Sequence, residues 1–400
     1  MRPLSKKVSG VERSQTLLLF ARAKKMRAEG IDVVSLTAGE PDFPTPAAVK
    51  EAGIRAIKEN FTKYTANQGI PELLRAIAEK FRRDNNLDFD PSQILVSSGA
   101  KHALYNALQA ICNPGDEVII PSPYWVSYPE MVKLVGATPV IVRTRASDQF
   151  KISPAQLRKA VTRKSKLFIF CSPSNPTGVV YTREEIEGLA RVIAQAGLYV
   201  ISDEIYEKII YDGMSHFSMG SLPSVRDLVV TVNGVSKAFS MTGWRIGFLG
   251  ANRDVASAAE KVQGQITSNA SSISQRAALA ALTSGLDGEV HTMVEEFARR
   301  RKFLCGAFDQ MNVEYIKPHG AFYIFARVKP ILGGKKAQGT IDTTDALSEY
   351  LLNSWRVALV PGGGFGAKDW VRISYACSMQ DLEKAAERLQ KAFAELRGAQ

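Results

Sequence analysis

Short apolar segments alternate with amphipathic ones over most of the first 288 residues, and this alternation predicts a sheet flanked by helices. Near-continuous apolar runs of this length are typical of strands buried on both faces. The expected strands are residues 94–97, 117–121, 167–171, 199–203 and 229–232. Between two of them, Thr182 and Glu185 form a capping box, and Gly197 ends the helix that follows. The pattern predicts an α/β domain with a largely parallel sheet.

The N-terminal stretch has a different organisation. Residues 14–29 carry apolar side chains at helical spacing and stop at Gly30, so they predict a helix. A loop rich in glycine and proline follows. Thr45 then precedes Pro46, which predicts a helix capped by Thr45 with proline in its first turn.

After about residue 288 the pattern changes again. A long charged helix is expected at 289–311 and a Gly/Lys-rich loop at 333–339, among short strands and two further helices. This order is typical of an α+β domain. We therefore expect an N-terminal arm that packs with the small domain, a large domain and a small C-terminal domain, with bounds 1–46, 47–288 and 289–400.

The composition favours a cytoplasmic protein. Of 400 residues, 45% are hydrophobic and 23% charged, which is ordinary for a soluble globular chain. No apolar run approaches the roughly 20 residues of a membrane-spanning helix, and the N-terminus lacks a signal-peptide pattern. The four cysteines are far apart and form no CxxC pair, so we expect free thiols, without bound metal or disulfides.

The net charge of +11 raises the question of nucleic-acid binding. The basic residues are dispersed, and the densest run, 299–302, lies in the predicted charged helix, where a solvated face is the simple interpretation. The sequence contains no recognised nucleic-acid module. We expect anionic small molecules as ligands, not nucleic acids or membranes.

Chemically active residues follow the predicted strands. Ligands of parallel α/β sheets bind at the carboxyl ends of the strands, so these residues are expected to meet. Residues 98–101 open a helix whose free N–H groups suit a phosphate. Trp125 offers an aromatic plate, Asn175 an amide held before a proline, and Asp203 a carboxylate that needs a cationic partner if buried. Lys237 offers an amine that becomes nucleophilic when desolvated.

Each of these residues also has an ordinary explanation, since Trp125 suits a core and Lys237 is one of 51 basic residues. One ligand, pyridoxal phosphate, accounts for the whole set. Its aldehyde needs an amine, which Lys237 offers, and its ring nitrogen needs an acidic partner, which Asp203 offers. Trp125 offers a plate on which the ring stacks, and Asn175 with Tyr206 offers donors to the phenolate oxygen. The cofactor's phosphate needs the helix start and a cation, for which the candidates are Gly99, Ala100, Lys101, Ser236 and Arg245.

Two further residues complete a substrate site. Arg372 has the planar fork that suits a carboxylate, although it could also be a surface arginine on a strand. Gly39, in the early loop, exposes backbone groups. Trp125 and Asn175 are expected to contact the substrate as well as the cofactor.

The chain resembles the fold-type I, class I pyridoxal-phosphate aminotransferases, in the branch of bacterial aspartate aminotransferases and bifunctional aspartate/prephenate aminotransferases. The segments that match in order are TAGEPDFPTP, TKYT, PGDEVIIPSPYWVSYPE, CSPSNPTG, SDEIYE, NGVSKAFSMTGWRIGF, GAFY and VRISYA. The resemblance implies a mostly parallel sheet of the seven-stranded type in the large domain and a homodimer with shared sites. It implies that Lys237 bonds to the cofactor, that Asp203 pairs with the ring nitrogen and that Arg372 binds the substrate α-carboxylate. It also implies that Tyr64 reaches the phosphate in the neighbouring subunit.

The resemblance does not decide which side chain the substrate carries beyond its α-carboxylate. Lys101 and Thr16 match the positions that meet a distal carboxylate in prephenate-competent relatives, whereas Glu12 departs from the lysine many relatives have there. We expect amino transfer between aspartate or glutamate and 2-oxo acids (oxaloacetate, 2-oxoglutarate), with prephenate as a further acceptor. The alternatives are an aromatic aminotransferase, a β-eliminating lyase on the same scaffold, and a non-catalytic regulator that binds DNA. Only about 35 residues precede the TAGEP segment, too few for an added DNA-binding domain.

Overall fold

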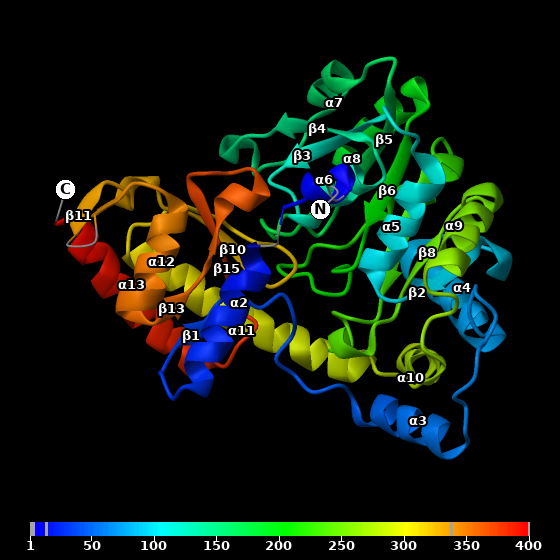
Figure 1. The fold of residues 1–400 in the computed structure, drawn as a ribbon, viewed down its shortest axis with the longest axis horizontal. Coiled ribbons are helices and arrows are strands. Elements are labelled where there is room, and N and C mark those ends of the chain that lie inside the picture. The colour runs from blue at the N-terminus through cyan, green and yellow to red at the C-terminus, as the bar shows by residue number, and fades with distance from the viewer. Residues whose placement is uncertain (1–4, 13–14, 337–338, 399–400) are drawn as a thin grey trace.

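A computed structural model describes residues 5–12, 15–336 and 339–398 of the chain. Figure 1 shows two bodies of unequal size, with the long helix α11 (Asp287–Gln310) extending from one to the other. The larger body contains a seven-stranded sheet and the smaller one a four-stranded sheet.

The large sheet has the strand order β2-β8-β7-β6-β5-β3-β4. Its strands are β2 (Ile94–Ser97), β3 (Glu117–Ser122), β4 (Thr138–Arg143), β5 (Ser165–Cys171), β6 (Tyr199–Asp203), β7 (Val229–Gly234) and β8 (Gly247–Gly250). The pairs from β4 to β7 are parallel, and β8 is antiparallel to both neighbours. This confirms the mostly parallel seven-stranded sheet. The hydrophobic pattern missed β4, an edge strand that is half exposed, and β8, which is only four residues long with glycine at both ends.

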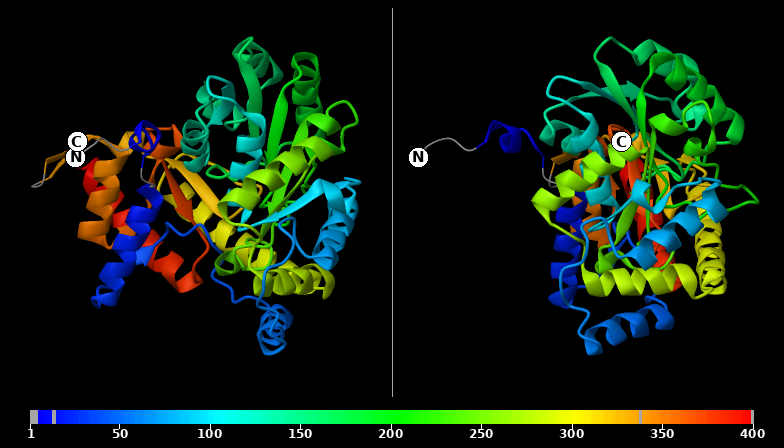
Figure 2. Two further views of the ribbon diagram at one scale, coloured as in Figure 1. Left: turned by 45° about the vertical axis from the view of Figure 1, so that its right-hand side comes forward. Right: turned by 90° about the vertical axis from the view of Figure 1, so that its right-hand side faces the viewer.

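The central strands are buried on both faces, as their sequences predicted. In β5, Leu167 and Ile169 pack into one hydrophobic cluster and Phe168 and Phe170 into another. The first cluster includes residues of α5, α6 and α9, and the second includes residues of α8. Figure 2 shows the helices on both sides of the sheet. In the register of β5 and β6, Cys171 lies beside Asp203, so the carboxyl ends of these strands meet at one edge.

The helices of the larger body are α3 (Ala47–Lys58), α4 (Pro71–Asn85), α5 (Ala100–Ile111), α6 (Ser127–Leu134), α7 (Pro154–Ala160), α8 (Arg183–Ala196), α9 (Arg253–Ile266) and α10 (Ser272–Thr283). Among them, α5 and α8 begin where the sequence predicted. The capping box of α8 is confirmed, because Thr182 Oγ1 accepts from the Glu185 N–H and Glu185 Oε2 accepts from the Thr182 N–H. The predicted Thr45 cap is wrong: its hydroxyl donates to Ser240 O at 2.8 Å, and Pro46 is the N-cap of α3.

The smaller body combines strands and helices. Its sheet has the order β14-β15-β10-β9, with β9 (Tyr315–Ile316), β10 (Tyr323–Arg327), β14 (Val360–Pro361) and β15 (Trp370–Ser374). Helices α12 (Thr344–Trp355) and α13 (Met379–Arg397) pack beside it. The predicted Gly/Lys-rich loop is wrong, because β11 (Gly334–Lys336) and β12 (Gly339–Ile341) pair there as an antiparallel hairpin; residues 337–338 lie outside the described part.

The N-terminal elements are α1 (Lys6–Ser9), α2 (Gln15–Ala28) and β1 (Val34–Ser35). As Figure 1 shows, α2 and β1 lie against the smaller body, whereas α1 lies beside α6 of the larger body. β1 pairs in parallel with β13 (Val357–Ala358), and α2 contacts both strands of this pair. We propose 1–46, 47–288 and 289–400 as the bounds of an arm, a large domain and a small domain, because α11 begins at Asp287 and β1 pairs with a C-terminal strand.

The charged run 299–302 was interpreted as a solvated helix face, and this is wrong for two of its residues. Arg300 and Arg301 are 6% and 7% exposed. Arg300 forms an ion pair with Asp42 at 2.6 Å, and Arg301 binds both carboxylate oxygens of Asp212, at 2.5 and 2.9 Å. The partners come from distant parts of the chain, so the arginines tie α11 to two loops.

Arg301→Ala is expected to lower the free energy of unfolding by about 2–3 kcal/mol, because it leaves Asp212 without its buried partner. The adjacent Arg299→Ala is the control, because Arg299 is exposed and solvent screens its pair with Glu296. Urea unfolding midpoints of the two variants make the comparison, and equal shifts would contradict the account. The difference should shrink as pH falls from 4 towards 2, because hydrogen bonds from Arg301 lower the pKa of Asp212 to about 2.

No helix in the described part of the chain is both long and apolar enough to cross a membrane. The four cysteines are free thiols. Burial raises the pKa of Cys112, Cys171 and Cys377 to about 12, which keeps these thiols protonated and unreactive near neutral pH.

Candidate active site

A cavity of about 410 Å³ lies at the carboxyl ends of the central strands. It is lined by strand ends of the large sheet, by the N-terminal loop and by β10 and β15 of the small sheet. The residues predicted from the sequence that line it are Gly39, Ala100, Lys101, Trp125, Asn175, Asp203, Tyr206, Ser236, Lys237, Arg245 and Arg372. A larger cavity of about 510 Å³ between α11 and α13 contains none of them, so the chemistry is concentrated in the first.

Lys237 lies in the loop after β7, and its side chain crosses the cavity. Its Nζ donates a 2.5 Å hydrogen bond to Gly39 O. Burial lowers the pKa of Lys237 to about 8; Arg245 and Arg372 contribute to this shift, whereas Glu40 and Asp203 oppose it. A larger fraction of the amine is therefore unprotonated near neutral pH than for a surface lysine, which suits it to act as a nucleophile and base.

Asp203 ends β6 and is 4% exposed. Tyr128 donates to its Oδ2 at 2.6 Å, and the Ile205 N–H donates to its Oδ1 at 3.3 Å. Burial raises the pKa of Asp203 to about 6, although these donors and Lys237 favour the ionised form. Asp203 forms no ion pair within the described residues. None of the described residues pairs with Asp203 as the cation expected from the sequence, and Asp203 lines the cavity, where a ligand can reach it.

Arg372 on β15 is 2% exposed, so its interpretation as a surface strand arginine is wrong. Its Nη1 donates to Asn175 Oδ1 at 3.1 Å and its Nη2 to Thr37 O at 2.9 Å. Its Nε is buried and has no hydrogen-bond partner in the described part of the chain. The guanidinium lies 4.4 Å from the centre of the Tyr323 ring. A buried guanidinium that binds no carboxylate among these residues is suited to an anionic ligand.

The start of α5 faces the same cavity. Gly99 caps this helix with φ 90°, a left-handed conformation that favours glycine, and a side chain there would also displace the Arg245 guanidinium. Arg245 donates to Thr242 O at 2.9 Å and to Ser98 O at 3.4 Å. Lys101 lies over the Trp125 ring at 4.7 Å, and burial lowers the pKa of its amine. The helix start, Arg245 and Lys101 together form a positively charged end of the cavity.

Three residues named from the sequence, Gly99, Tyr64 and Glu12, are not among the residues that line the cavity. Tyr64 is 90% exposed. Glu12 is exposed, and its backbone N–H donates to Glu130 Oε2 at 2.9 Å. Thr16 belongs to α2, but its side chain lies outside the described set.

Sequence reasoning missed several residues of the site. Tyr128 binds Asp203, and Tyr323 forms a 2.8 Å hydrogen bond with the Tyr206 hydroxyl. Glu40 lines the cavity and accepts from the Thr242 hydroxyl at 2.7 Å. Each lies within a segment quoted for the family resemblance, which is the one signal in the sequence that points to them.

Comparisons with known proteins agree with this geometry. Residues 31–389 match the family model "Aminotransferase class I and II". The chain is 48% identical to a bifunctional aspartate aminotransferase and glutamate/aspartate-prephenate aminotransferase of Petunia hybrida, over 98% of the chain and 82% of the relative. It is 43% identical to a probable aspartate/prephenate aminotransferase of Rickettsia bellii, over 98% and 99%. The aspartate aminotransferase of Thermus thermophilus, solved with maleate, superimposes with a TM-score of 0.93 at 43% identity, over 98% and 100%.

Proposed function

The chain belongs to the class I and II aminotransferase family, and we propose that it moves amino groups between aspartate or glutamate and 2-oxo acids, with prephenate as a further acceptor that becomes arogenate. The observation that carries this proposal is the meeting of a nucleophilic amine, Lys237, a buried carboxylate, Asp203, and a buried guanidinium, Arg372, in one cavity.

The family uses pyridoxal phosphate, and the cavity fits this cofactor. Asp203 lacks a cationic partner among the described residues, which suits a protonated ring nitrogen. The positive end formed by the α5 start, Arg245 and Lys101 suits a phosphate. When bound, pyridoxal phosphate supplies an aldehyde that captures amino groups and a protonated ring that accepts the electron pair left by deprotonation of the substrate.

These positions support a role for each residue. Lys237 would bond to the aldehyde, Asp203 would accept from the ring N–H, and Tyr206 and Asn175 would hold the phenolate oxygen. Trp125 would supply the aromatic plate for the ring. Gly99, Ala100, Lys101, Ser236 and Arg245 would hold the phosphate.

The chain's own groups then carry the proton. Once the substrate amino acid has displaced the Lys237 amine, the free Nζ of Lys237 would remove the proton from the substrate Cα. In the reverse half-reaction the same amine would return a proton to that carbon. Arg372 and the Gly39 backbone hold the α-carboxylate, which fixes the Cα–H bond beside the amine. Asp203 stays ionised and keeps the ring nitrogen protonated.

Lys101 and Thr16 are proposed to bind the second carboxylate of the substrate, and this favours transamination of dicarboxylates over the aromatic and lyase alternatives. The Lys101 ammonium lines the cavity and lies over Trp125, within reach of a substrate side chain. The test is a comparison of kcat/KM for aspartate, prephenate and phenylpyruvate. High values for the first two are expected. Near-zero turnover of prephenate would contradict its place among the substrates, and release of ammonia from the amino donor would favour the lyase.

We also propose a homodimer in which Tyr64 of each subunit binds the phosphate in the other. Its 90% exposure in the single chain, outside the cavity, supports this role because such a tyrosine is free to reach a neighbouring subunit.

Arg372→Lys is expected to raise KM for the amino donor by about 10²-fold, because an ammonium cannot reproduce the two-pronged contact with a carboxylate. The control is Arg327→Lys on the neighbouring strand, where the arginine is partly exposed and pairs with Glu314 at 2.8 Å. Steady-state kinetics at varied donor concentration measure the effect. An unchanged KM in Arg372→Lys would rule out this carboxylate site.

Capture of pyridoxal phosphate by the protein freed of cofactor is expected to accelerate as pH rises through about 8 and then to level off. The reason is that only the unprotonated amine attacks an aldehyde, and burial lowers the pKa of Lys237 from 10.5 to about 8. Stopped-flow absorbance gives the rate at each pH. A rate that keeps rising to pH 10 would contradict the lowered pKa.

A further inference from the structure

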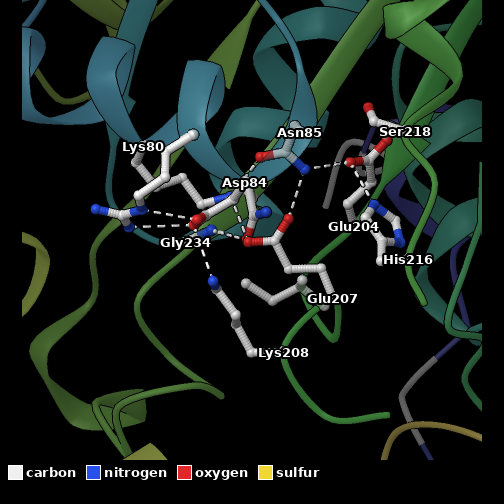
Figure 3. Close-up of polar contacts among 12 residues, drawn as sticks. Lys80, Asp84, Asn85, Glu204, Glu207, Lys208, His216, Ser218 and Gly234 are labelled. Atoms are coloured by element: carbon white, nitrogen blue, oxygen red, sulfur yellow. Dashed lines mark hydrogen bonds and ion pairs between the residues drawn. The ribbon is translucent and has the colours of Figure 1, made fainter. Parts of the chain in front are cut away.

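A second group of buried ionisable side chains lies behind Asp203, outside the cavity. Figure 3 shows Asn85 of α4 between Glu204 and Glu207, with His216 and Lys80 at either end. We call Lys80, Asn85, Glu204, Glu207 and His216 the inner network. The roles proposed above use none of these residues.

Glu204 is the centre of the inner network and is 1% exposed. Its Oε1 accepts from the hydroxyls of Ser202 and Ser218, both at 2.8 Å. Its Oε2 lies 2.8 Å from His216 Nε2 and accepts from Asn85 Nδ2 at 3.1 Å. Four groups therefore fix the orientation of this carboxylate.

Glu204, Glu207 and His216 are of the types that bind metal ions, and their ligand atoms lie within 4.8 Å of one another. The Lys80 ammonium, however, forms an ion pair with Glu207 and donates to Asn85 Oδ1 at 2.6 Å. Glu207 Oε2 accepts from Asn85 at 2.6 Å. Lys80 thus supplies the positive charge that a metal ion would bring, and every carboxylate oxygen of the two glutamates already has a partner.

The backbone places the inner network opposite the cavity. Asp203 ends β6, and the Glu204 N–H donates to Val232 O at 2.9 Å, which continues the strand pairing by one residue. Successive side chains of an extended chain point to opposite faces. Asp203 accordingly lines the cavity, whereas Glu204 does not.

Glu204 acts on Asp203 through its charge as well. Burial is the main cause that raises the pKa of Asp203, and the neighbouring Glu204 carboxylate raises it further. Hydrogen bonds from Tyr128 and the Ile205 N–H, and the charge of Lys237, lower this pKa. A Glu204 charge without compensation therefore favours the protonated form of Asp203, which holds a ring N–H less well.

His216 is the neighbour of Glu204 best suited to offset that charge. Burial alone would lower the pKa of His216, and the charge of Lys80 also lowers it. The charges of Glu204 and Glu207 outweigh both and raise this pKa above its usual value. Its Nδ1 is buried and has no hydrogen-bond partner among the described residues, so Glu204 is its one hydrogen-bonding contact there. Among the other charged groups near the inner network, Asp84 pairs with Lys208 at 3.0 Å and with Arg83 at 2.8 Å, and it lies 3.7 Å from Lys80.

We propose that His216 is a positioning residue for Asp203: it holds the Glu204 carboxylate on the far face of β6 and compensates its charge, so that Asp203 alone faces the ring nitrogen as an ionised group. The inference rests on the proposed function, since it concerns the cofactor contact of Asp203. Ser218 assists from the other side of the same carboxylate.

The test uses enzyme loaded with pyridoxal phosphate that carries ¹⁵N in its ring, whose NMR shift reports protonation of the ring nitrogen. In His216→Ala the ¹⁵N chemical shift of the ring at neutral pH should move towards the value of an unprotonated nitrogen. Asp203→Asn, which removes the carboxylate itself, should move the shift in the same direction and serves as the reference. The kcat of His216→Ala should fall on the order of tenfold, with KM within about twofold, because a less ionised Asp203 holds the ring proton less well. His291→Ala, which removes an exposed histidine paired with Glu295, is the control and should match the wild type.

A wild-type nitrogen shift in His216→Ala, or an equal change in His291→Ala, overturns the inference while Asp203→Asn still tests the proposed function by itself. If His216→Ala does not fold, Ser218→Ala removes one donor from Glu204 and must move the shift in the same direction; an unchanged shift there also overturns it. An unchanged shift in Asp203→Asn contradicts the Asp203 assignment and this inference with it.

Discussion

Lys237→Ala is expected to lower the rate of amino transfer by about 10⁴-fold or more, the largest loss of any single substitution in this protein. The variant lacks both the amine that bonds to the cofactor aldehyde and the base that takes the Cα proton. The wild-type amine is well prepared for both roles, because burial lowers its pKa to about 8 and Gly39 O fixes its position at 2.5 Å.

Lys237→Arg tests whether the positive charge at position 237 is sufficient for activity without a nucleophilic amine. The guanidinium keeps the positive charge but stays protonated and attacks no aldehyde, so this variant should be as inactive as Lys237→Ala. Lys261→Ala, at an exposed site on α9, should keep wild-type activity. Single-turnover measurements with aspartate are suitable, and wild-type rates in either Lys237 variant would refute its catalytic role.

Asp203→Asn is expected to lower kcat by about 10²- to 10⁴-fold, because the buried pair between the carboxylate and the ring nitrogen is worth about 3–5 kcal/mol when one partner is removed. The amide has nearly the same shape, so the fold should survive. It cannot accept from the ring N–H as a charged group, and the ring then loses its proton and its capacity to take up electrons.

Tyr128→Phe gives a graded comparison with Asp203→Asn. It removes only the 2.6 Å hydrogen bond to Asp203 Oδ2 and should cost about tenfold in kcat. Visible circular dichroism of the bound cofactor confirms that both variants are loaded. The account predicts a much smaller effect for Tyr128→Phe, and a larger loss in Tyr128→Phe than in Asp203→Asn contradicts it.

The strand ends explain why much of the site could be predicted from the sequence. Asp203 and Lys237 follow apolar runs that can only be buried strands, and parallel strands bring their carboxyl ends together. The sequence therefore placed these residues in one cavity without any knowledge of helix packing.

The missed residues depend on contacts between distant segments. Arg300 and Arg301 were interpreted as surface charges because their partners, Asp42 and Asp212, are remote in the chain. Tyr323 reaches Tyr206 only because β10 of the small sheet approaches β6. Local patterns contain no information on such approaches.

Short elements were the other source of error. The hairpin of β11 and β12 was interpreted as a loop because glycine and lysine are poor strand formers. Thr45 looked like a helix cap, but its hydroxyl is engaged by Ser240, far along the chain. In both cases a tertiary contact outweighed local propensity.

The most direct test of amino transfer is a spectrum of the purified, cofactor-loaded protein. The purified protein is expected to be yellow and to lose its visible absorbance when aspartate is added in the absence of any 2-oxo acid, with one oxaloacetate formed per site. Addition of 2-oxoglutarate should restore the colour and release glutamate. A protein whose absorbance is unchanged by aspartate, or one that releases ammonia in place of transferring the amino group, would contradict the assignment.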